Sequence, residues 1–300
     1  MTENTSLDVV IVTYANRELI TVCLDSLFEY APRSARMNVY IADNASPDDT
    51  VAVVSEGYPQ VTLIARASND GFAVANNELI ARTTAEYVLI LNPDTRMEPG
   101  TLDHLLTVMA EEKDIGVLGC RLLTADGTLD HAAKRSFPSP ASALKYFALR
   151  AFGRSGSDYV RPDVGESDVA DVDAINGAFM LIRRDALDRV GGLDERYWMY
   201  GEDLDWCARF HKAGWRVVYD GRVKAHHAKG GSTKGSRPPR LNYHFHRSMV
   251  IFYLDHGRDR RSPLDIAVIA GVWLRFAMTT VTGSIRNAIR TATTRRDART

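Results

Sequence analysis

The chain has 300 residues, of which 45% are hydrophobic and 25% charged, and its formal net charge is −1. This is the composition of an ordinary globular protein, with room for one large α/β domain and a modest addition. Its three cysteines match no zinc or redox spacing, so we expect buried free thiols in a reducing compartment. The first residues, MTENTSLD, lack the basic and apolar regions of a signal peptide.

Four strand-like runs predict a parallel sheet in the first part of the chain. They are apolar and often β-branched, and they cover residues 8–13, 38–42, 61–65 and 87–91. Helical segments separate them, the clearest at 17–30. Alternating strands and helices indicate a parallel sheet with right-handed crossovers. Such sheets bind ligands at the carboxyl ends of their strands, where Thr13, Tyr14, Asp43, Asn92 and Asp94 fall.

The second part of the chain is less regular. Residues 125–170 are rich in Gly, Ser, Pro and charge, with one apolar stretch at 141–152, and we interpret them as a variable, partly mobile insertion. The elements expected after it are a strand at 178–182, a helix at 202–213, strands at 215–219 and 223–226, and helices at 241–256 and 264–290. We therefore divide the chain into a main α/β domain, 1–257, and a helical basic extension, 258–300.

The charge is unevenly distributed. Residues 226–300 hold 14 of the 37 Lys and Arg but 4 of the 38 Asp and Glu. A basic C-terminal quarter indicates contact with phosphates, from a diphosphate substrate, an anionic lipid or nucleic acid, or else a solvated face. No aromatic–basic platform or known motif supports nucleic acid, and we expect none to bind. The basic loop at 229–240 lacks the Walker pattern, although its Lys and Arg residues could close over a diphosphate.

The fragment Asn92–Pro93–Asp94–Thr95 follows an apolar strand. A carboxylate held at a strand end is suited to a hard divalent cation that also contacts substrate phosphates. The alternative is an Asx/Pro turn that simply ends the strand.

A second acidic group, Glu202, Asp203 and Asp205, opens a predicted helix. Acidic residues also stabilise helix starts, so capping is the competing interpretation. The preceding aromatic run, at 197–200, favours a sugar-stacking wall beside a general base.

His226 ends the predicted strand at 223–226, and His227 comes directly after it. His226 beside a carboxylate could complete a metal shell, whereas a lone histidine is usually structural. His244 and His246 lie two residues apart on a predicted helix, where side chains diverge, so we expect no zinc there.

Taken in order, these segments resemble the inverting family-2 glycosyltransferases with a GT-A fold. The matching strings are VVIVTYAN at 9–16, IADNASPDDT at 41–50, NDGFAVANN at 69–77, LNPDT at 91–95, the long NGAFMLIRRDALDRVGGLDERYWMYGEDLDWCARFHKAGWRVVYD at 176–220, and AHH at 225–227. The resemblance implies a mixed α/β sheet flanked by helices and a nucleotide diphosphate sugar donor.

The resemblance also implies roles for residues. Thr13, Tyr14 and Asp43 would hold the donor's base, with Asp43 accepting from its N3–H. Asn69, Gly71 and Asn77 would line the nucleotide pocket. Asn92 and Asp94 stand at the family's metal-binding DxD, where Asn replaces the first Asp, so one carboxylate ligand to Mg²⁺ or Mn²⁺ is expected, with His226 as a further metal contact. Asp203 would deprotonate the acceptor hydroxyl, and Glu202 would orient the acceptor.

The string YHFHRSMVIFYLDHG at 243–257 most resembles dTDP-rhamnosyltransferases of actinobacterial type. Those enzymes add L-rhamnose to N-acetylglucosamine on a polyprenyl diphosphate. Two alternatives remain: a transferase with another donor, such as galactofuranose or a hexose, and a catalytically silent nucleotide-binding module of a membrane complex. The three retained acids at 202, 203 and 205 argue against the silent module.

Residues 264–283 are mostly apolar over about the length that spans a bilayer. Asp265 and Arg275 argue against insertion, while arginines on both sides favour an anionic surface. We expect a helix that lies on the inner face of the cell membrane and keeps a cytoplasmic enzyme there. The alternative is packing on the catalytic domain or on a partner subunit, which includes a homo-oligomer.

Overall fold

The computed structural model describes residues 5–138, 158–228, 237–257 and 263–297. Its strands are β1 (Ser6–Thr13), β2 (Arg36–Asp43), β3 (Thr62–Ala65), β4 (Tyr87–Leu91), β5 (Thr95–Arg96), β6 (Ile115–Leu123), β7 (Val169–Asp171), β8 (Phe179–Arg183) and β9 (Arg216–His227). Its helices are α1 (Arg17–Glu29), α2 (Thr50–Gly57), α3 (Phe72–Ile80), α4 (Thr101–Glu111), α6 (Arg184–Val190), α7 (Glu202–Lys212), α8 (Pro239–His256) and α9 (Pro263–Asp297). A 3₁₀ turn covers Asp158–Val160.

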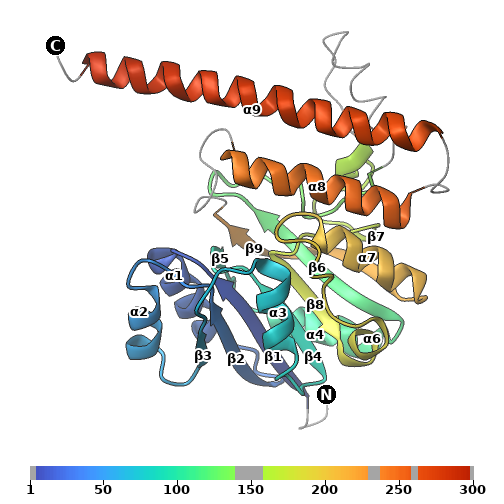
Figure 1. Cartoon of the computed structure of the whole chain (residues 1–300). Helices are drawn as coiled ribbons and strands as arrows, with labels where there is room; N and C mark the ends of the chain where they lie inside the picture. Colours follow the sequence, from blue (N-terminus) through green and yellow to red (C-terminus); the bar gives the residue numbers. More distant parts are fainter. Residues whose placement is uncertain (1–4, 139–157, 229–236, 258–262, 298–300) are drawn as a thin grey trace.

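One mixed sheet forms the centre of the molecule, with helices around it (Figure 1). The strand order is β3-β2-β1-β4-β8-β6-β9-β5, and β7 pairs with β9. β1 to β4 are parallel, as predicted, while β8 is antiparallel to both β4 and β6. β6 ends at the carboxyl edge of the sheet, and β8, which runs antiparallel to it, begins at that edge. β9 then runs parallel to β6.

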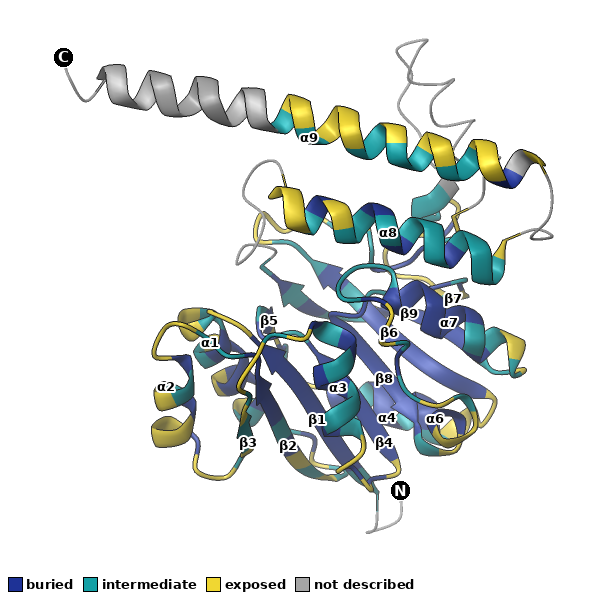
Figure 2. Cartoon of the chain, viewed as in Figure 1, coloured by how far each residue is buried: buried dark blue, intermediate teal, exposed yellow. Residues whose placement is uncertain are grey.

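The core is built from the predicted apolar runs. All five residues of β4 are buried, and α1 buries Ile20, Cys23, Leu24 and Leu27 on the face its 3.6-residue period predicts (Figure 2). The three cysteines are free and buried, which confirms the absence of a disulfide among them.

The short strands β5 and β7 were not predicted, and two longer strands also differ from the prediction. β6 was not predicted, because glycines interrupt its apolar run: a Cβ on Gly116 would lie 2.7 Å from Trp215 Cβ, and one on Gly119 would lie 2.8 Å from Ile175 Cδ1. These glycines allow close packing in the middle of a strand. β9 is one strand of 12 residues rather than two runs.

The prediction of a partly mobile insertion at 125–170 is partly wrong. Its described part, up to 138 and from 158, places Asp130, Lys134 and Arg135 in buried positions. The apolar stretch at 141–152 lies outside the described residues, as do Lys229 and Lys234 of the basic loop.

The C-terminal helices lie side by side, with α8 between α7 and α9 (Figure 1). Tyr253 Oη donates to Asp265 Oδ1 at 2.6 Å, and Asn242 Nδ2 donates to the hydroxyls of Thr279 and Thr280 at 3.0 and 2.9 Å. By length and composition, Asp265–Gly283 of α9 could cross a membrane: its mean hydropathy is 1.5, and 6% of the window is buried.

Candidate active site

The carboxyl ends of β1, β2, β4, β6 and β9 meet at one edge of the sheet. Because β8 runs the other way, its start lies at the same edge, and the backbone N–H of Asn92 donates to Ala178 O there, at 3.0 Å. Side chains from distant parts of the sequence are thereby gathered, as a ligand site at strand ends requires.

The β1 and β2 ends form the expected nucleotide-base region. Asp43 is 1% exposed and accepts from Ser46, whose N–H lies 2.8 Å from Oδ1 and whose hydroxyl lies 2.5 Å from Oδ2. Ala15 and Ala45 have φ values of 51° and 61°, and non-glycine residues in this region cluster at functional loops. Thr13 Oγ1 is buried with no partner among the described groups, while Tyr14 is exposed.

The loop before α3 is tied to the segment that precedes α7. Asn69 Oδ1 accepts from Gly71 N, and Phe72 N donates to Trp198 O at 2.9 Å. A Cβ on Gly71 would lie 2.4 Å from Trp198 O, and its φ is +100°, so glycine is required.

Asn77 has a different environment from the one expected. Its Nδ2 donates to Leu193 O at 2.8 Å and to Glu195 Oε1 at 3.0 Å, and its Oδ1 accepts from Leu193 N at 2.8 Å. These three bonds hold the 193–195 loop against α3, which favours a structural role over contact with a nucleotide.

The expected metal ligands Asp94 and His226 line one small cavity with Leu19 and Val22 of α1. His226 Nε2, however, is bonded to Glu98 Oε1 at 2.8 Å. The direct neighbour of Asp94 is His227, whose Nε2 lies 3.3 Å from Asp94 Oδ1. Successive residues of a strand point to opposite faces, and β9 turns His227 rather than His226 toward Asp94.

A buried carboxylate holds His227 in place. Nδ1 of His227 donates to Asp130 Oδ2 at 2.9 Å, and Asp130 is 0% exposed. Burial lowers the pKa of His227, but hydrogen bonds and charge from Asp130 and Asp94 raise it to about 9. Without a metal, His227 is therefore protonated at neutral pH, and its Nε2–H faces Asp94 Oδ1. A cation bound between the two side chains would displace that proton, and the Asp–His–ligand arrangement is common around protein metals.

The acidic pair at the start of α7 is buried, with 8% of Glu202 and 9% of Asp203 exposed. Asp203 Oδ2 accepts from Arg135 at 2.6 Å and from Gly177 N at 3.1 Å. Arg135 is also buried, and although burial lowers its pKa, the charge of Asp203 raises it above the ordinary value. Asp203 of α7 is thus a carboxylate held in place beside Gly177, just before β8. No side chain caps the start of α7.

Glu202 differs from its neighbour. Its Oε2 has no partner among the described groups, and burial together with the charge of Asp203 raises its pKa to about 8. Glu202 is therefore mainly protonated at pH 7, beside Asp203 in its ion pair with Arg135, and two carboxyl groups in different environments can take different roles.

Glu202→Gln should stabilise the protein at neutral pH. The ordinary pKa is 4.5 and the folded value about 8, so between these the folded state holds the extra proton and stability falls as pH rises. Removing this penalty gives about 3 kcal/mol at pH 7, and a melting temperature higher by several degrees. Thermal unfolding across pH 4.5 to 8 checks this: the gain should shrink toward pH 4.5. The exposed Glu56→Gln is the control, and a gain independent of pH would contradict the assignment.

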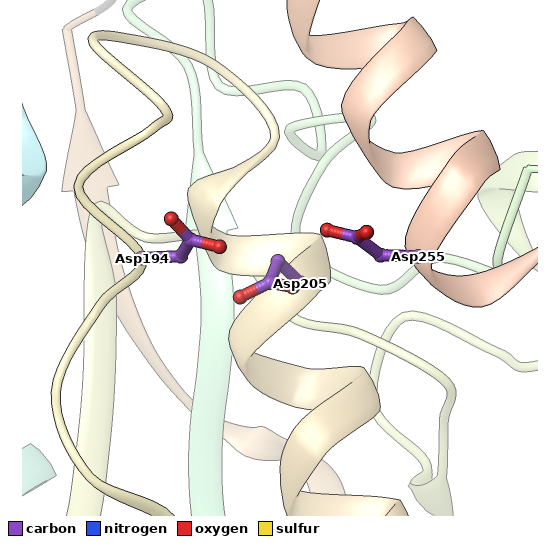
Figure 3. Close-up of side chains that lie close together, drawn as sticks. All are labelled: Asp194, Asp205 and Asp255. Atoms are coloured by element: carbon purple, nitrogen blue, oxygen red, sulfur yellow. The ribbon is translucent and has the colours of Figure 1, made fainter.

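Asp205 belongs to another cluster, with Asp194 and Asp255, whose carboxylate oxygens lie within 4.8 Å of one another (Figure 3). Basic side chains already accompany them: Arg196 contacts Asp194 and Asp255, Arg209 Nε lies 2.8 Å from Asp205, and His256 Nε2 lies 2.7 Å from Asp205. The cluster joins α7, α8 and the loop before α7, and we assign it this structural role rather than a metal.

Three residues of the site were missed by sequence reasoning: Asp130, Arg135 and His227. The first two lie in the segment interpreted as an insertion, and the signal available was a basic and an acidic residue close to the DGT turn at 126–128. His227 was missed because its neighbour His226 was expected to be the metal contact.

Comparison with known proteins identifies the family of this chain. The model of the family described as glycosyl transferase family 2 matches residues 8–191. N-acetylglucosaminyl-diphospho-decaprenol L-rhamnosyltransferase of Mycobacterium tuberculosis is 32% identical over 272 residues, which cover 86% of this chain and 87% of that protein.

Solved structures agree on the fold. A mannosyltransferase from Pyrobaculum calidifontis, in complex with GDP-Man and Mn²⁺, has a TM-score of 0.60 at 22% identity and covers 97% of this chain and 76% of that one. S. aureus TarS 1-349, in complex with UDP-GlcNAc, has a TM-score of 0.55 at 16% identity and covers 93% and 73%. With its GT-A fold and its acids gathered at the carboxyl edge of the sheet, this chain belongs to glycosyl transferase family 2 and is a glycosyltransferase.

Proposed function

We propose that this enzyme transfers L-rhamnose from dTDP-rhamnose to a polyprenyl-diphosphate-linked N-acetylglucosamine, with inversion. The observation that carries the reaction type is the buried Asp203 at the carboxyl edge of the sheet, fixed by Arg135 and Gly177 N–H. The named relative, similar over most of both chains, supports the donor sugar and the acceptor.

The mechanism is a single displacement. Asp203 accepts the proton of the acceptor hydroxyl, whose oxygen attacks the anomeric carbon from the face opposite the nucleotide. The bond to the nucleotide diphosphate breaks and its oxygen takes the electron pair, so configuration inverts. Glu202, kept neutral by burial, orients the acceptor by donating a hydrogen bond. No covalent enzyme intermediate is required.

A divalent metal fits the residues present. Asp94 and His227 offer a carboxylate oxygen and an imidazole nitrogen 3.3 Å apart, with Asp130 fixing the histidine, and Asn92 lies at the same strand end. We propose His227, in place of the expected His226, as the histidine contact to Mg²⁺ or Mn²⁺. A bound metal would supply Lewis-acid stabilisation of the departing diphosphate.

A binding panel tests the donor assignment. Thymidine and uridine diphosphate should both raise the melting temperature more than guanosine diphosphate, because both bases carry the N3–H that Asp43 accepts. Thymidine diphosphate should raise it most, since its 5-methyl group adds apolar contact. Asp43→Ala should remove the preference over guanosine diphosphate. Equal stabilisation by all three nucleotides would contradict the donor, and a preference for the uridine compound would indicate another sugar.

We further propose that α9 lies on an anionic membrane surface and keeps the enzyme at the cytoplasmic face. One stripe of the helix is exposed and uncharged: Ile266, Ala267, Ala270, Gly271, Leu274, Ala277, Met278 and Val281. The charged residues that argued against insertion face α8. Asp265 accepts a hydrogen bond from Tyr253. The pKa of His246 on α8 is lowered mainly by its burial and also by the charge of Arg275. The helix packs on α8 and presents an apolar face, which fits a surface helix rather than a spanning one.

Replacing exposed apolar residues of α9 should release the enzyme from vesicles. Leu274→Glu with Met278→Glu should lower partition onto anionic vesicles at least about tenfold, since each buried side chain contributes roughly 1.5–3 kcal/mol. Val169→Glu, an exposed valine on β7, adds charge away from the helix and is the control. Cosedimentation is the measurement, and equal pelleting of all forms would mean that α9 is not the anchor.

A further inference from the structure

Two arginines at the start of α8 lie on aromatic rings. The Arg240 guanidinium carbon is 4.9 Å from the ring centroid of Trp198, and that of Arg237 is 4.1 Å from Phe245 and 5.3 Å from Tyr200. His244 stacks on Trp198 with 4.6 Å between centroids. Both arginines are exposed, while the rings beneath them are half-buried.

These arginines differ from others in the molecule. Arg196, Arg209 and Arg216 each contact a carboxylate. For Arg237 and Arg240, no carboxylate in the described part of the chain lies within 4.0 Å. Stacking holds a guanidinium by its face and leaves its in-plane N–H groups free, and that edge matches a phosphate in two-bond geometry.

Their position points to the acceptor side of the site. Tyr200 precedes the base Asp203 by three residues, and the chain continues directly from the ring platform into α7. Trp198, under Arg240, is also the residue whose carbonyl holds the loop before α3. The donor's diphosphate, by contrast, belongs at Asp94 and His227 on the ends of β4 and β9. The first turn of α8, in which Pro239 has no N–H, adds backbone N–H groups that no side chain in the described part of the chain caps.

We propose that Arg237 and Arg240, on the platform of Trp198, Tyr200 and Phe245, bind the diphosphate of the lipid-linked acceptor. This inference rests on the proposed function, because it assigns the acceptor's charged group to that site. Two guanidinium groups match two phosphates, and they lie on Tyr200 and Trp198, which precede Asp203 by three and five residues. Phosphates bound there would bring the sugar that they carry toward the base.

Two acceptors separate the phosphate contact from other effects. One is a short-chain prenyl diphosphate N-acetylglucosamine, and the other is the same chain joined to the sugar without phosphate. Arg240→Gln and Arg237→Gln should each raise the KM for the diphosphate acceptor about tenfold or more, with the KM for the neutral acceptor and for the donor unchanged. Arg240→Lys, which keeps the charge but cannot stack as a plane, should fall between. Arg36→Gln, an exposed arginine at the start of β2, should change nothing.

Several outcomes would overturn the inference. A matching rise in donor KM would place the arginines on the nucleotide's diphosphate, and an equal effect on the neutral acceptor would make them structural. Loss of vesicle binding with unchanged KM would assign them to lipid headgroups. If the wild type transfers no sugar, the proposed function fails; calorimetric binding of the diphosphate acceptor, lost in Arg240→Gln, then still decides the inference.

Discussion

Asp203→Asn should lower turnover at least about 100-fold, because an amide cannot take the acceptor proton and a general base contributes roughly 10²–10⁴. The donor KM should change little, since the nucleotide loops after β1 and β2 do not contact this side chain in the structure. Steady-state kinetics with varied donor measure both quantities. Asp188→Asn, an exposed aspartate on α6, is the matched control.

The same substitution also removes the counter-charge of a buried arginine. Asp203→Asn should therefore lose stability as well as turnover, since an unpaired buried charge is costly. Adding Arg135→Gln should recover stability without recovering turnover. Near wild-type turnover of Asp203→Asn, or recovery of turnover in the double variant, would show that Asp203 is not the base.

Chelation should abolish transfer, and Mg²⁺ or Mn²⁺ should restore it. Neighbouring histidines provide a sharp comparison: His227→Ala should weaken Mn²⁺ binding at least about tenfold, while His226→Ala, whose side chain bonds Glu98, should have a small effect. Asp94→Ala should weaken donor binding only when metal is present. Calorimetry with Mn²⁺ measures the affinity independently of activity.

Two results would contradict this metal site. Full activity in chelator would show that transfer needs no metal. A larger loss of Mn²⁺ affinity in His226→Ala than in His227→Ala would restore the ligand expected from the sequence, and would require the β9 end to rearrange.

The fold was predictable where local patterns were strong. β4 was predicted with its observed bounds, and α7 and α8 to within two residues, because apolar periodicity is a local property. β6 was not predicted because Gly116 and Gly119 interrupt its apolar pattern. These glycines make room for Trp215 and Ile175, and only the folded structure reveals those contacts.

The site was predictable as far as residue type determines chemistry. Asp94, Glu202 and Asp203 were singled out by their position at strand and helix ends and by the family resemblance, and their roles stay predictions. The choice between His226 and His227 depends on which face of β9 meets Asp94, and register is set by sheet pairing. Asp130 and Arg135 lie in a polar, glycine-containing segment, and their burial depends on its folding beneath the carboxyl edge.

Mass spectrometry of the product tests the central claim most directly. The purified enzyme, with Mn²⁺ and a short-chain prenyl diphosphate N-acetylglucosamine, should be offered dTDP-rhamnose, UDP-galactofuranose and UDP-glucose in separate reactions. We expect one added deoxyhexose on the lipid-linked acceptor with dTDP-rhamnose, and the loss of this product with Asp203→Asn. Transfer of a hexose instead, or donor hydrolysis with an unmodified acceptor in every reaction, would contradict it.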